Sequence, residues 1–323
     1  MTMNDKSLHD IFIDILRNKI PDHASLANNL VDMLYIGKEA VYRRLRGEVP
    51  FTFNEISVIA RRMGISLDQL IGTVSERNRP FTFKITRFAY PEEIDYVMIK
   101  EYVNLLQNAR DEDSDTEMGI AAKMIPDALH LRYKNITRFY LFKWLYQYDN
   151  IEGIKKFHEV ESTEEMLSIL DESKDLYNYI KDVYYIFDKM IFKNIVDDIK
   201  YFEKIGLILR KDVEELQESL FSLVDYLENL AITGVNEVGN KVRLYISNVN
   251  FEAGYCYLNS EKYKLNMVRI FTLYDIYSLD HYSLTTASKW MQSLKRGSIL
   301  ISESGEMQRL IFFKEQREII SSL

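Results

Sequence analysis

The sequence contains a single cysteine, Cys256, and only 5 prolines and 12 glycines among its 323 residues. One cysteine excludes a disulfide within the chain, and there is no cysteine pair to hold a structural zinc ion. With 47% hydrophobic and 28% charged residues, the composition is not that of a disordered or low-complexity chain. We therefore expect a folded protein from a reducing compartment.

Long apolar runs are also absent. No stretch without charged side chains approaches the ~18 residues that a membrane-spanning helix needs. The first residues, from Met1 to Lys6, lack the apolar region of a secretory signal. We expect a cytoplasmic location and no membrane partner.

The charge is distributed unevenly along the chain. The net charge is −8, yet residues 1–72 hold nine basic and nine acidic side chains, so the rest of the chain carries the whole excess. Within residues 37–47 there are four basic side chains and only one acidic side chain, Glu39. A basic segment in an acidic protein is a first indication of nucleic-acid binding.

Capping residues and hydrophobic spacing predict five short helices near the start of the chain. Thr52 with Glu55, and Ser66 with Gln69, have the spacing of capping boxes, and Pro21, Gly47 and Gly64 mark helix ends. The predicted helices span residues 7–19, 24–34, 38–46, 52–63 and 66–71. We expect them to form a compact domain over residues 1–73.

The second and third of these helices, joined by the turn 35–37, have the proportions of a helix-turn-helix. Val41 and Leu45 lie four residues apart and should anchor the third helix to its own domain. The opposite face would then meet DNA in the major groove. Its candidate DNA-binding residues are Lys38, Glu39, Tyr42, Arg43 and Arg46.

The chemistry of this face suits a duplex. Arginine presents a planar fork to guanine O6 and N7, and lysine or tyrosine can reach phosphates or base edges. Our hypothesis is that Arg43 reads a base and Arg46 holds a phosphate. The alternative is an ordinary solvated helix face, because charge clusters on helices are usually of that kind.

Residues 41–50 read Val-Tyr-Arg-Arg-Leu-Arg-Gly-Glu-Val-Pro, and residues 59–70 read Ile-Ala-Arg-Arg-Met-Gly-Ile-Ser-Leu-Asp-Gln-Leu. Together these strings resemble the DNA-binding domain of lambda-repressor-like regulators of the xenobiotic-response-element type. The resemblance covers about residues 7–72 and implies sequence-specific DNA binding, usually as a dimer. The chain departs from the family pattern at Ala27, Val31 and Tyr35, where the family often has Gln, Ala and Gly.

The rest of the chain is predicted to be a linker, 74–91, a helical region, 92–240, and a small α/β unit, 241–323. The helical region should contain helices at 92–109, 117–147, 164–204 and 210–231. Apolar residues at 213–230 form one narrow seam, whose partner is either another helix of the same chain or a second copy. After residue 241 the periodicity falls to two, which predicts a mostly antiparallel sheet, with helices at 285–296 and 306–320.

The sequence shows no catalytic signature. It has no phosphate-binding loop, dinucleotide fingerprint or hydrolase elbow, and its five histidines lack metal-ligand spacing. Asp111, Asp113 and Asp115 begin like a calcium loop, but Thr116 replaces the glycine that such a loop requires. Tyrosines concentrated in 245–282 could line a pocket or pack a core. We expect no cofactor and no enzyme.

The sequence therefore predicts a mainly α transcription regulator with an N-terminal five-helix bundle, a long helical middle and a small C-terminal α/β unit. Its expected partners are double-stranded DNA, a second copy of the chain, and a small-molecule or peptide effector. A dimer would match half-sites ~34–36 Å apart. Two alternatives remain: an antitoxin-like module that contacts protein instead of DNA, and an enzyme in residues 92–323 with the N-terminal domain as a targeting arm.

Overall fold

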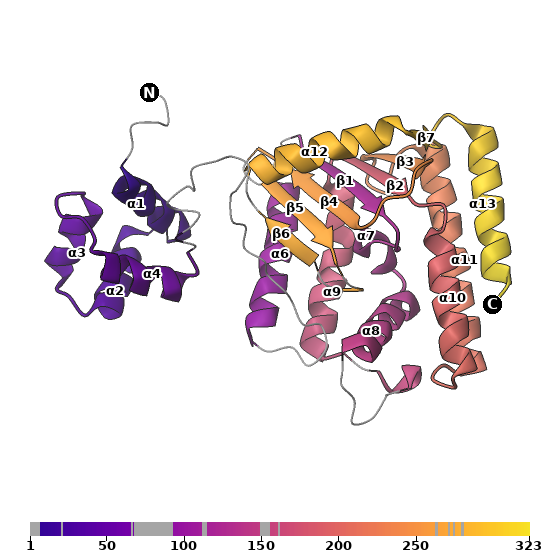
Figure 1. Ribbon diagram of the computed structural model, residues 1–323, viewed down its shortest axis with the longest axis horizontal. Helices are drawn as coiled ribbons and strands as arrows, with labels where there is room; N and C mark the ends of the chain where they lie inside the picture. Colours follow the sequence, from indigo (N-terminus) through magenta and orange to yellow (C-terminus); the bar gives the residue numbers. More distant parts are fainter. Residues whose placement is uncertain are drawn as a thin grey trace. The chain divides into compact units, whose positions relative to one another are not determined.

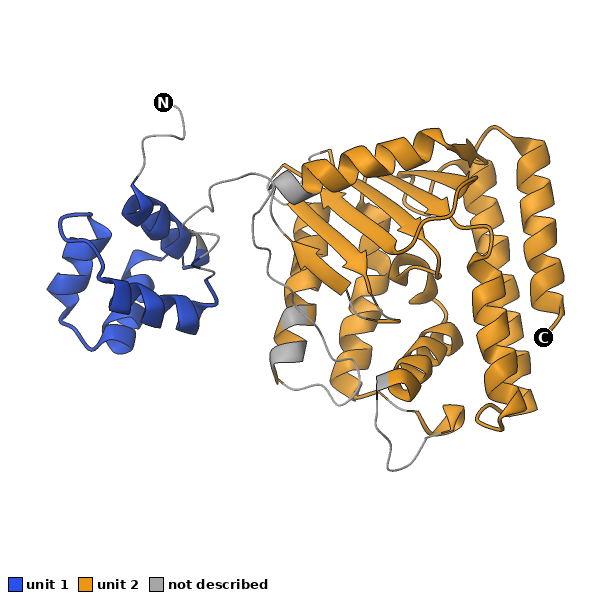
Figure 2. Ribbon diagram, in the orientation of Figure 1, with its two compact units in different colours: residues 1–82 blue, residues 83–323 orange. Residues whose placement is uncertain are grey.

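The computed structural model describes residues 7–20, 22–65, 67, 93–111, 115–148, 156–160, 162–261, 264–270, 272–273, 275–278 and 281–323. The chain forms two compact units, Met1–Thr82 and Phe83–Leu323 (Figure 2). The linker expected at 74–91 lies outside the described residues, as does the helix expected at 66–71 apart from residue 67.

The smaller unit contains four described helices (Figure 1), which lie at the predicted positions: α1 Leu8–Lys19, α2 His23–Leu34, α3 Lys38–Leu45 and α4 Phe53–Met63. Capping boxes begin two of them, with Ser7 and Asp10 at α1 and Thr52 and Glu55 at α4. Each box satisfies backbone N–H groups that the first helical turn leaves unpaired. The core of the unit is formed by fully buried residues that include Phe12, Leu16, Leu26, Leu30 and Ile59.

The larger unit is built on a sheet of seven described strands in the order β6-β5-β4-β1-β2-β3-β7. Strands β1, β2 and β3 run parallel to one another, and every other pair of neighbours in the described sheet is antiparallel. The strands are β1 Glu117–Ala122, β2 Asp182–Phe187, β3 Lys241–Ser247, β4 Gly254–Asn259, β5 Lys264–Arg269, β6 Asp275–Ser278 and β7 Ser298–Leu300.

Helices cover both faces of this sheet (Figure 1). On one face α12 packs over the strands through a cluster that includes Leu284, Met291 and Leu294. The larger core lies on the other face, where the crossover segments between the parallel strands pack. The helices are α6 Glu93–Asp111, α7 Asp127–His130, α8 Lys134–Tyr148, α9 Glu164–Leu176, α10 Ile191–Lys204, α11 Arg210–Thr233, α12 His281–Arg296 and α13 Glu306–Ser321, with short 3-10 turns η2 Phe157–Glu159 and η3 Tyr177–Tyr179.

The predicted fold class is wrong in this unit. The sheet is neither small nor confined to the C-terminal part of the chain, because β1 and β2 lie inside the region predicted to be helical and pair with strands on both sides. The predicted helices 117–147 and 164–204 each contain one of these strands. Five of the six residues of each strand are buried, so the strands show no polar and apolar alternation that could reveal them in the sequence.

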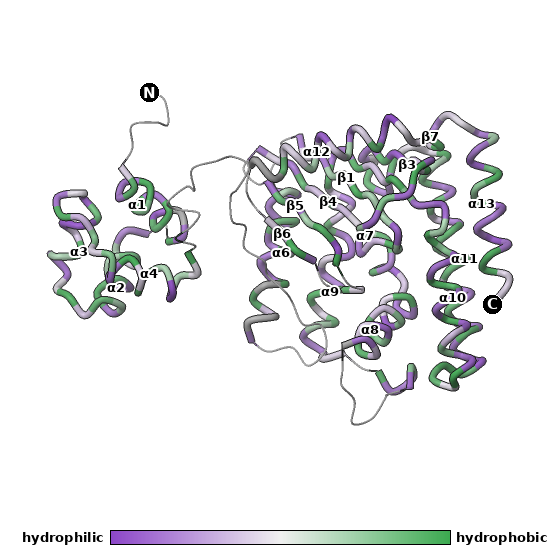
Figure 3. The backbone as a smooth tube through the Cα atoms, viewed as in Figure 1, coloured by the Kyte–Doolittle hydropathy of each residue, from purple (hydrophilic) through white to green (hydrophobic). Residues whose placement is uncertain are grey.

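The apolar seam at 213–230 packs within the chain. Its six apolar residues on α11 are between 0% and 3% exposed, and α11 contacts α8, α13 and β3. Figure 3 shows the hydrophobic residues that run along α10 and α11. The seam therefore packs against elements of the same chain, which is one of the two alternatives that the sequence left open.

None of the helices in the described part of the chain is both long enough and apolar enough to cross a membrane.

Candidate functional site

The third helix of the smaller unit is fixed to its neighbours by both apolar and polar contacts. Val41 and Leu45 are buried, at 0% and 5% exposure. Arg17 of α1 donates a hydrogen bond of 3.0 Å from Nη2 to the Leu45 carbonyl, which caps the end of α3. Arg44 pairs with Glu55 of α4 at 2.9 Å, and both side chains are 16% exposed. Arg44 thus joins α3 to α4.

The opposite face of α3 is open to solvent. Lys38, Glu39, Arg43 and Arg46 are exposed, with Arg46 one residue beyond the end of the helix. Tyr42 is half-buried, because part of its ring packs against the core of the unit. The structure therefore brings all five predicted residues onto one short element and leaves four of them accessible.

Acidic partners reduce the positive charge of this face. Arg46 pairs with Glu48 at 2.6 Å and with Glu39 at 3.1 Å, and Arg43 lies 3.5 Å from Glu48. The hydrogen bonds that Arg46 donates to Glu48 and Glu39 raise the pKa of Arg46, and those that Glu48 accepts lower the pKa of Glu48. Sequence reasoning missed Glu48, which lies beyond the closing glycine of the helix. A phosphate would have to displace it from Arg46.

The turn before α3 contains an unusual residue. Tyr35 has φ 54° and ψ 37°, in the left-handed region, and its side chain is 85% exposed. Its N–H donates to the Val31 carbonyl at 2.9 Å and closes α2. A left-handed residue in this place suits glycine, the residue that the resembling family usually has here.

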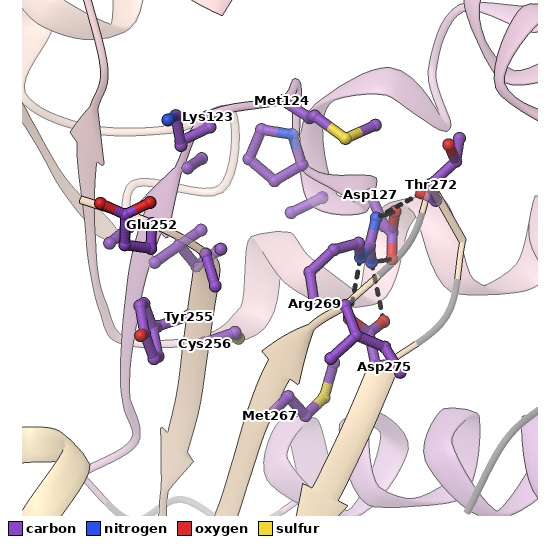
Figure 4. Close-up of a pocket in the computed structure, with 18 of the residues that line it drawn as sticks. Lys123, Met124, Asp127, Glu252, Tyr255, Cys256, Met267, Arg269, Thr272 and Asp275 are labelled. Atoms are coloured by element: carbon purple, nitrogen blue, oxygen red, sulfur yellow. Dashed lines mark hydrogen bonds and ion pairs between the residues drawn. The ribbon is translucent and has the colours of Figure 1, made fainter. Parts of the chain in front are cut away.

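The larger unit contains a pocket of about 560 Å³ that no sequence motif indicated (Figure 4). It lies at the carboxyl end of β1, on the sheet face where Ile120 belongs to the larger core. Residues 120–124, 126–128 and 252–256 line it, together with the end of β5 and residues 270, 272 and 275. Tyr102 of α6, Tyr177 of η3, and Lys143 and Gln147 of α8 complete the wall.

One wall of the pocket is a buried ion cluster. Arg269 binds Asp127 through Nη2 at 2.7 Å and Nη1 at 3.1 Å, and Asp275 through Nε and Nη2 at 2.8 Å. The fifth N–H of Arg269 faces the Thr272 carbonyl at 3.4 Å. His130 approaches Asp127 through Nε2 at 3.0 Å. The guanidinium therefore has no donor left for a ligand.

The two carboxyl groups of this cluster differ in their surroundings. Burial opposes the charge of Asp127, but Arg269 and His130 together hold its pKa well below its usual range. For Asp275, burial raises the pKa more than Arg269 lowers it. Arg269 and His130 therefore offset the negative charge of Asp127 more fully than Arg269 alone offsets that of Asp275.

One thiol and two hydroxyls of the lining, those of Cys256, Tyr102 and Tyr177, are neutral at physiological pH. Burial raises the pKa of the Cys256 thiol, so this cysteine is not an activated nucleophile. The hydroxyls of Tyr102 and Tyr177 lie 3.0 Å apart, and burial raises the pKa of both. Among the tyrosines concentrated at 245–282, Tyr255 lines the pocket.

Within the described residues, no group of three or more histidine, cysteine or acidic side chains is placed to hold a metal ion. Comparison of the chain with protein-family models, with curated proteins and with solved structures found no match.

Proposed function

We propose that this chain is a sequence-specific DNA-binding transcription regulator that acts as a homodimer. The observation that carries the proposal is the attachment of α3, whose Val41 and Leu45 are buried while Lys38, Arg43 and Arg46 on its other side are exposed. A short helix held in this way can enter the major groove with its basic side chains directed at the duplex.

Two arginines have separate tasks in this proposal. Arg43 is 54% exposed, and its ion pair with Glu48 is long, at 3.5 Å, so its guanidinium can form the two hydrogen bonds that guanine offers. Arg46 exchanges its carboxylate partners for a phosphate at the end of the helix. Glu48 competes with DNA for Arg46 and thereby weakens non-specific binding.

Dimerisation supplies the affinity that one small helix lacks. Two linked modules gain by effective concentration and select half-sites ~34–36 Å apart. The larger unit would carry the second function of the regulator, the response to a small-molecule or peptide effector. A cytoplasmic location fits this activity.

The test begins with a genomic footprint of the purified full-length chain, followed by titrations on the preferred sequence. Arg43→Ala should cost ~1–3 kcal/mol on that sequence and relax specificity at one position, because a bidentate base contact is lost. Arg46→Ala should weaken binding to all sequences alike. Arg62→Ala, an exposed arginine of α4, is the matched control and should change little.

Salt dependence separates this proposal from its alternative. A regulator that neutralises phosphates loses affinity steeply as salt rises. The alternative is an antitoxin-like module that binds protein through the same face, and the two carboxylates paired with Arg46 on that face, Glu39 and Glu48, favour it. Weak DNA binding without salt dependence, or equal small losses for Arg43→Ala and Arg46→Ala, would reject the DNA-binding assignment.

A further inference from the structure

The pocket of the larger unit has the position and size of a ligand site. In open α/β sheets, ligands bind beyond the carboxyl ends of the parallel strands, and this pocket adjoins the end of β1 where the neighbour changes from parallel β2 to antiparallel β4. Its volume of about 560 Å³ falls within the range of sites for small organic ligands.

Most of the lining is apolar. Ile120 and Ala122 of β1, Met124 after it, Ala128 of α7 and Met267 of β5 contribute hydrocarbon or thioether surface. Such walls favour the body of an apolar or aromatic ligand over a phosphate or a sugar, which would leave polar groups unpaired. Glycine at position 254 lets the backbone of β4 lie close to the Arg269 side chain, since a Cβ at this position would lie 3.2 Å from the Arg269 Cβ.

The ion cluster leaves one carboxylate under-compensated. Arg269 pairs with both Asp127 and Asp275, and His130 approaches only Asp127, so Asp275 shares its guanidinium with a second carboxylate and has no cation of its own. The Asp275 side chain is 19% exposed, and the residue lines the pocket. A carboxylate oxygen has lone pairs for more than the single N–H that each Asp275 oxygen receives from Arg269.

The other charges of the lining cancel. Lys143 is paired with Asp198 of α10. Lys123 and Glu252 have opposite charges and lie on the same side of the pocket, away from Arg269 (Figure 4). Among these described lining residues, Asp275 is therefore the carboxylate that has no cation of its own.

We propose that this pocket binds a small organic cation, an amine attached to an apolar or aromatic body, with the ammonium group against Asp275 and the body against Ile120, Ala122 and Met267. The ammonium supplies a cation for Asp275 and donates to the free lone pairs of its carboxylate. This binding does not depend on DNA, so the proposal stands or fails separately from the proposed function.

The experiment compares three probes with the same body and different charge: tryptamine as the cation, tryptophol as the neutral compound and indole-3-propionate as the anion. Each is titrated calorimetrically into the full-length protein without DNA at millimolar concentrations. Tryptamine should bind about tenfold more tightly than tryptophol, because only the amine forms a charge-assisted hydrogen bond. Indole-3-propionate should bind most weakly, because its carboxylate is repelled by the carboxylate of Asp275.

Two variants locate the amine. Asp275→Asn keeps the shape of the side chain and should abolish the preference for tryptamine over tryptophol while leaving tryptophol binding unchanged. Should this variant unfold, Glu252→Gln provides the second measurement, because Glu252 is exposed and its loss should lower tryptamine affinity a few-fold by reducing the negative charge. Glu318→Gln on α13, 66% exposed and outside the pocket lining, is the matched control and should change nothing.

Three outcomes overturn the proposal. The first is equal or tighter binding of tryptophol or indole-3-propionate. The second is an unchanged tryptamine preference in a folded Asp275→Asn protein or, where that variant unfolds, in Glu252→Gln. The third is the absence of heat from tryptamine at millimolar concentration.

Discussion

Replacing Tyr35 by glycine should stabilise the smaller unit. Tyr35 has a left-handed backbone, with φ 54°, and this conformation costs an ordinary residue ~1–2 kcal/mol relative to the right-handed one. Its side chain is 85% exposed, so little buried surface is lost with it. Glycine adopts the left-handed region without a steric penalty.

The expected gain is the difference between two effects. Glycine relieves the ~1–2 kcal/mol of strain but adds ~0.4–1 kcal/mol of entropy to the unfolded chain. The net stabilisation is therefore about 0.5–1 kcal/mol. Because ~1.4 kcal/mol changes an equilibrium constant tenfold, amides that exchange only when the unit unfolds should exchange ~2–5-fold more slowly. Hydrogen exchange of the full-length protein, followed by mass spectrometry over residues 23–63, measures it, and the larger unit is the internal reference.

Gly64→Ala is the matched control with the opposite sign. Gly64 ends α4 at φ 62° and ψ 40°, and a Cβ built on it meets nothing within 4 Å. Alanine there should lower stability by about 1 kcal/mol through backbone strain alone. Faster exchange in Tyr35→Gly, or no change while Gly64→Ala behaves as expected, would refute the reasoning and indicate that the Tyr35 side chain makes stabilising contacts.

Three further predictions concern the cores of the two units. Burial opposes the charge of Glu55, but the hydrogen bonds that its carboxylate accepts from Thr52 and Arg44 lower its pKa below the ordinary 4.5. Its contribution to stability is therefore present above that pH and lost as the pH falls through the lowered pKa. Glu55→Gln should cost ~1.5–3 kcal/mol at pH 7, and hydrogen exchange should show this deficit shrinking towards pH 3. Leu220 is fully buried, so Leu220→Ala should destabilise the larger unit by about 3–5 kcal/mol in denaturant unfolding. Leu310→Ala, at an exposed position, is the control and should cost under ~0.5 kcal/mol. Equal losses for the two variants would show that α11 is not a core helix. Gly119→Ala should cost ~1–3 kcal/mol in the same assay, because its Cβ would lie 2.5 Å from the Tyr257 ring and 2.6 Å from Tyr184; an unchanged midpoint would contradict this packing.

The helices of the smaller unit were predictable because their ends are encoded locally. Ser7 and Thr52 cap helices through residues three positions away, and Gly64 closes one in the left-handed conformation. The apolar spacing of Val41 and Leu45 gave the buried side of α3. Ion pairs such as Arg46 with Glu48 were not predictable, because spacing does not show which rotamer a long side chain adopts.

The strands of the sheet were predictable only where polar and apolar residues alternate along the sequence. β3 has polar and apolar residues in turn, whereas β1 and β2 are buried on both faces and resemble short pieces of buried helix. The pocket could not be predicted at all, because Asp127, Arg269 and Asp275 come from separate elements and meet only when β5 and β6 join the sheet beside α7. No local feature of the sequence indicates that these three side chains lie together.

The order of the strands has a consequence for synthesis on the ribosome. Glu117 of β1 pairs with Asp182 on one side and with Asn259 on the other, so one neighbour of β1 is translated long after the strand itself. Until that late segment emerges, β1 presents an open edge, and closing so large a chain loop is slow. The helices of the smaller unit need only near neighbours, so this unit can be complete while the nascent larger unit still depends on protection from aggregation.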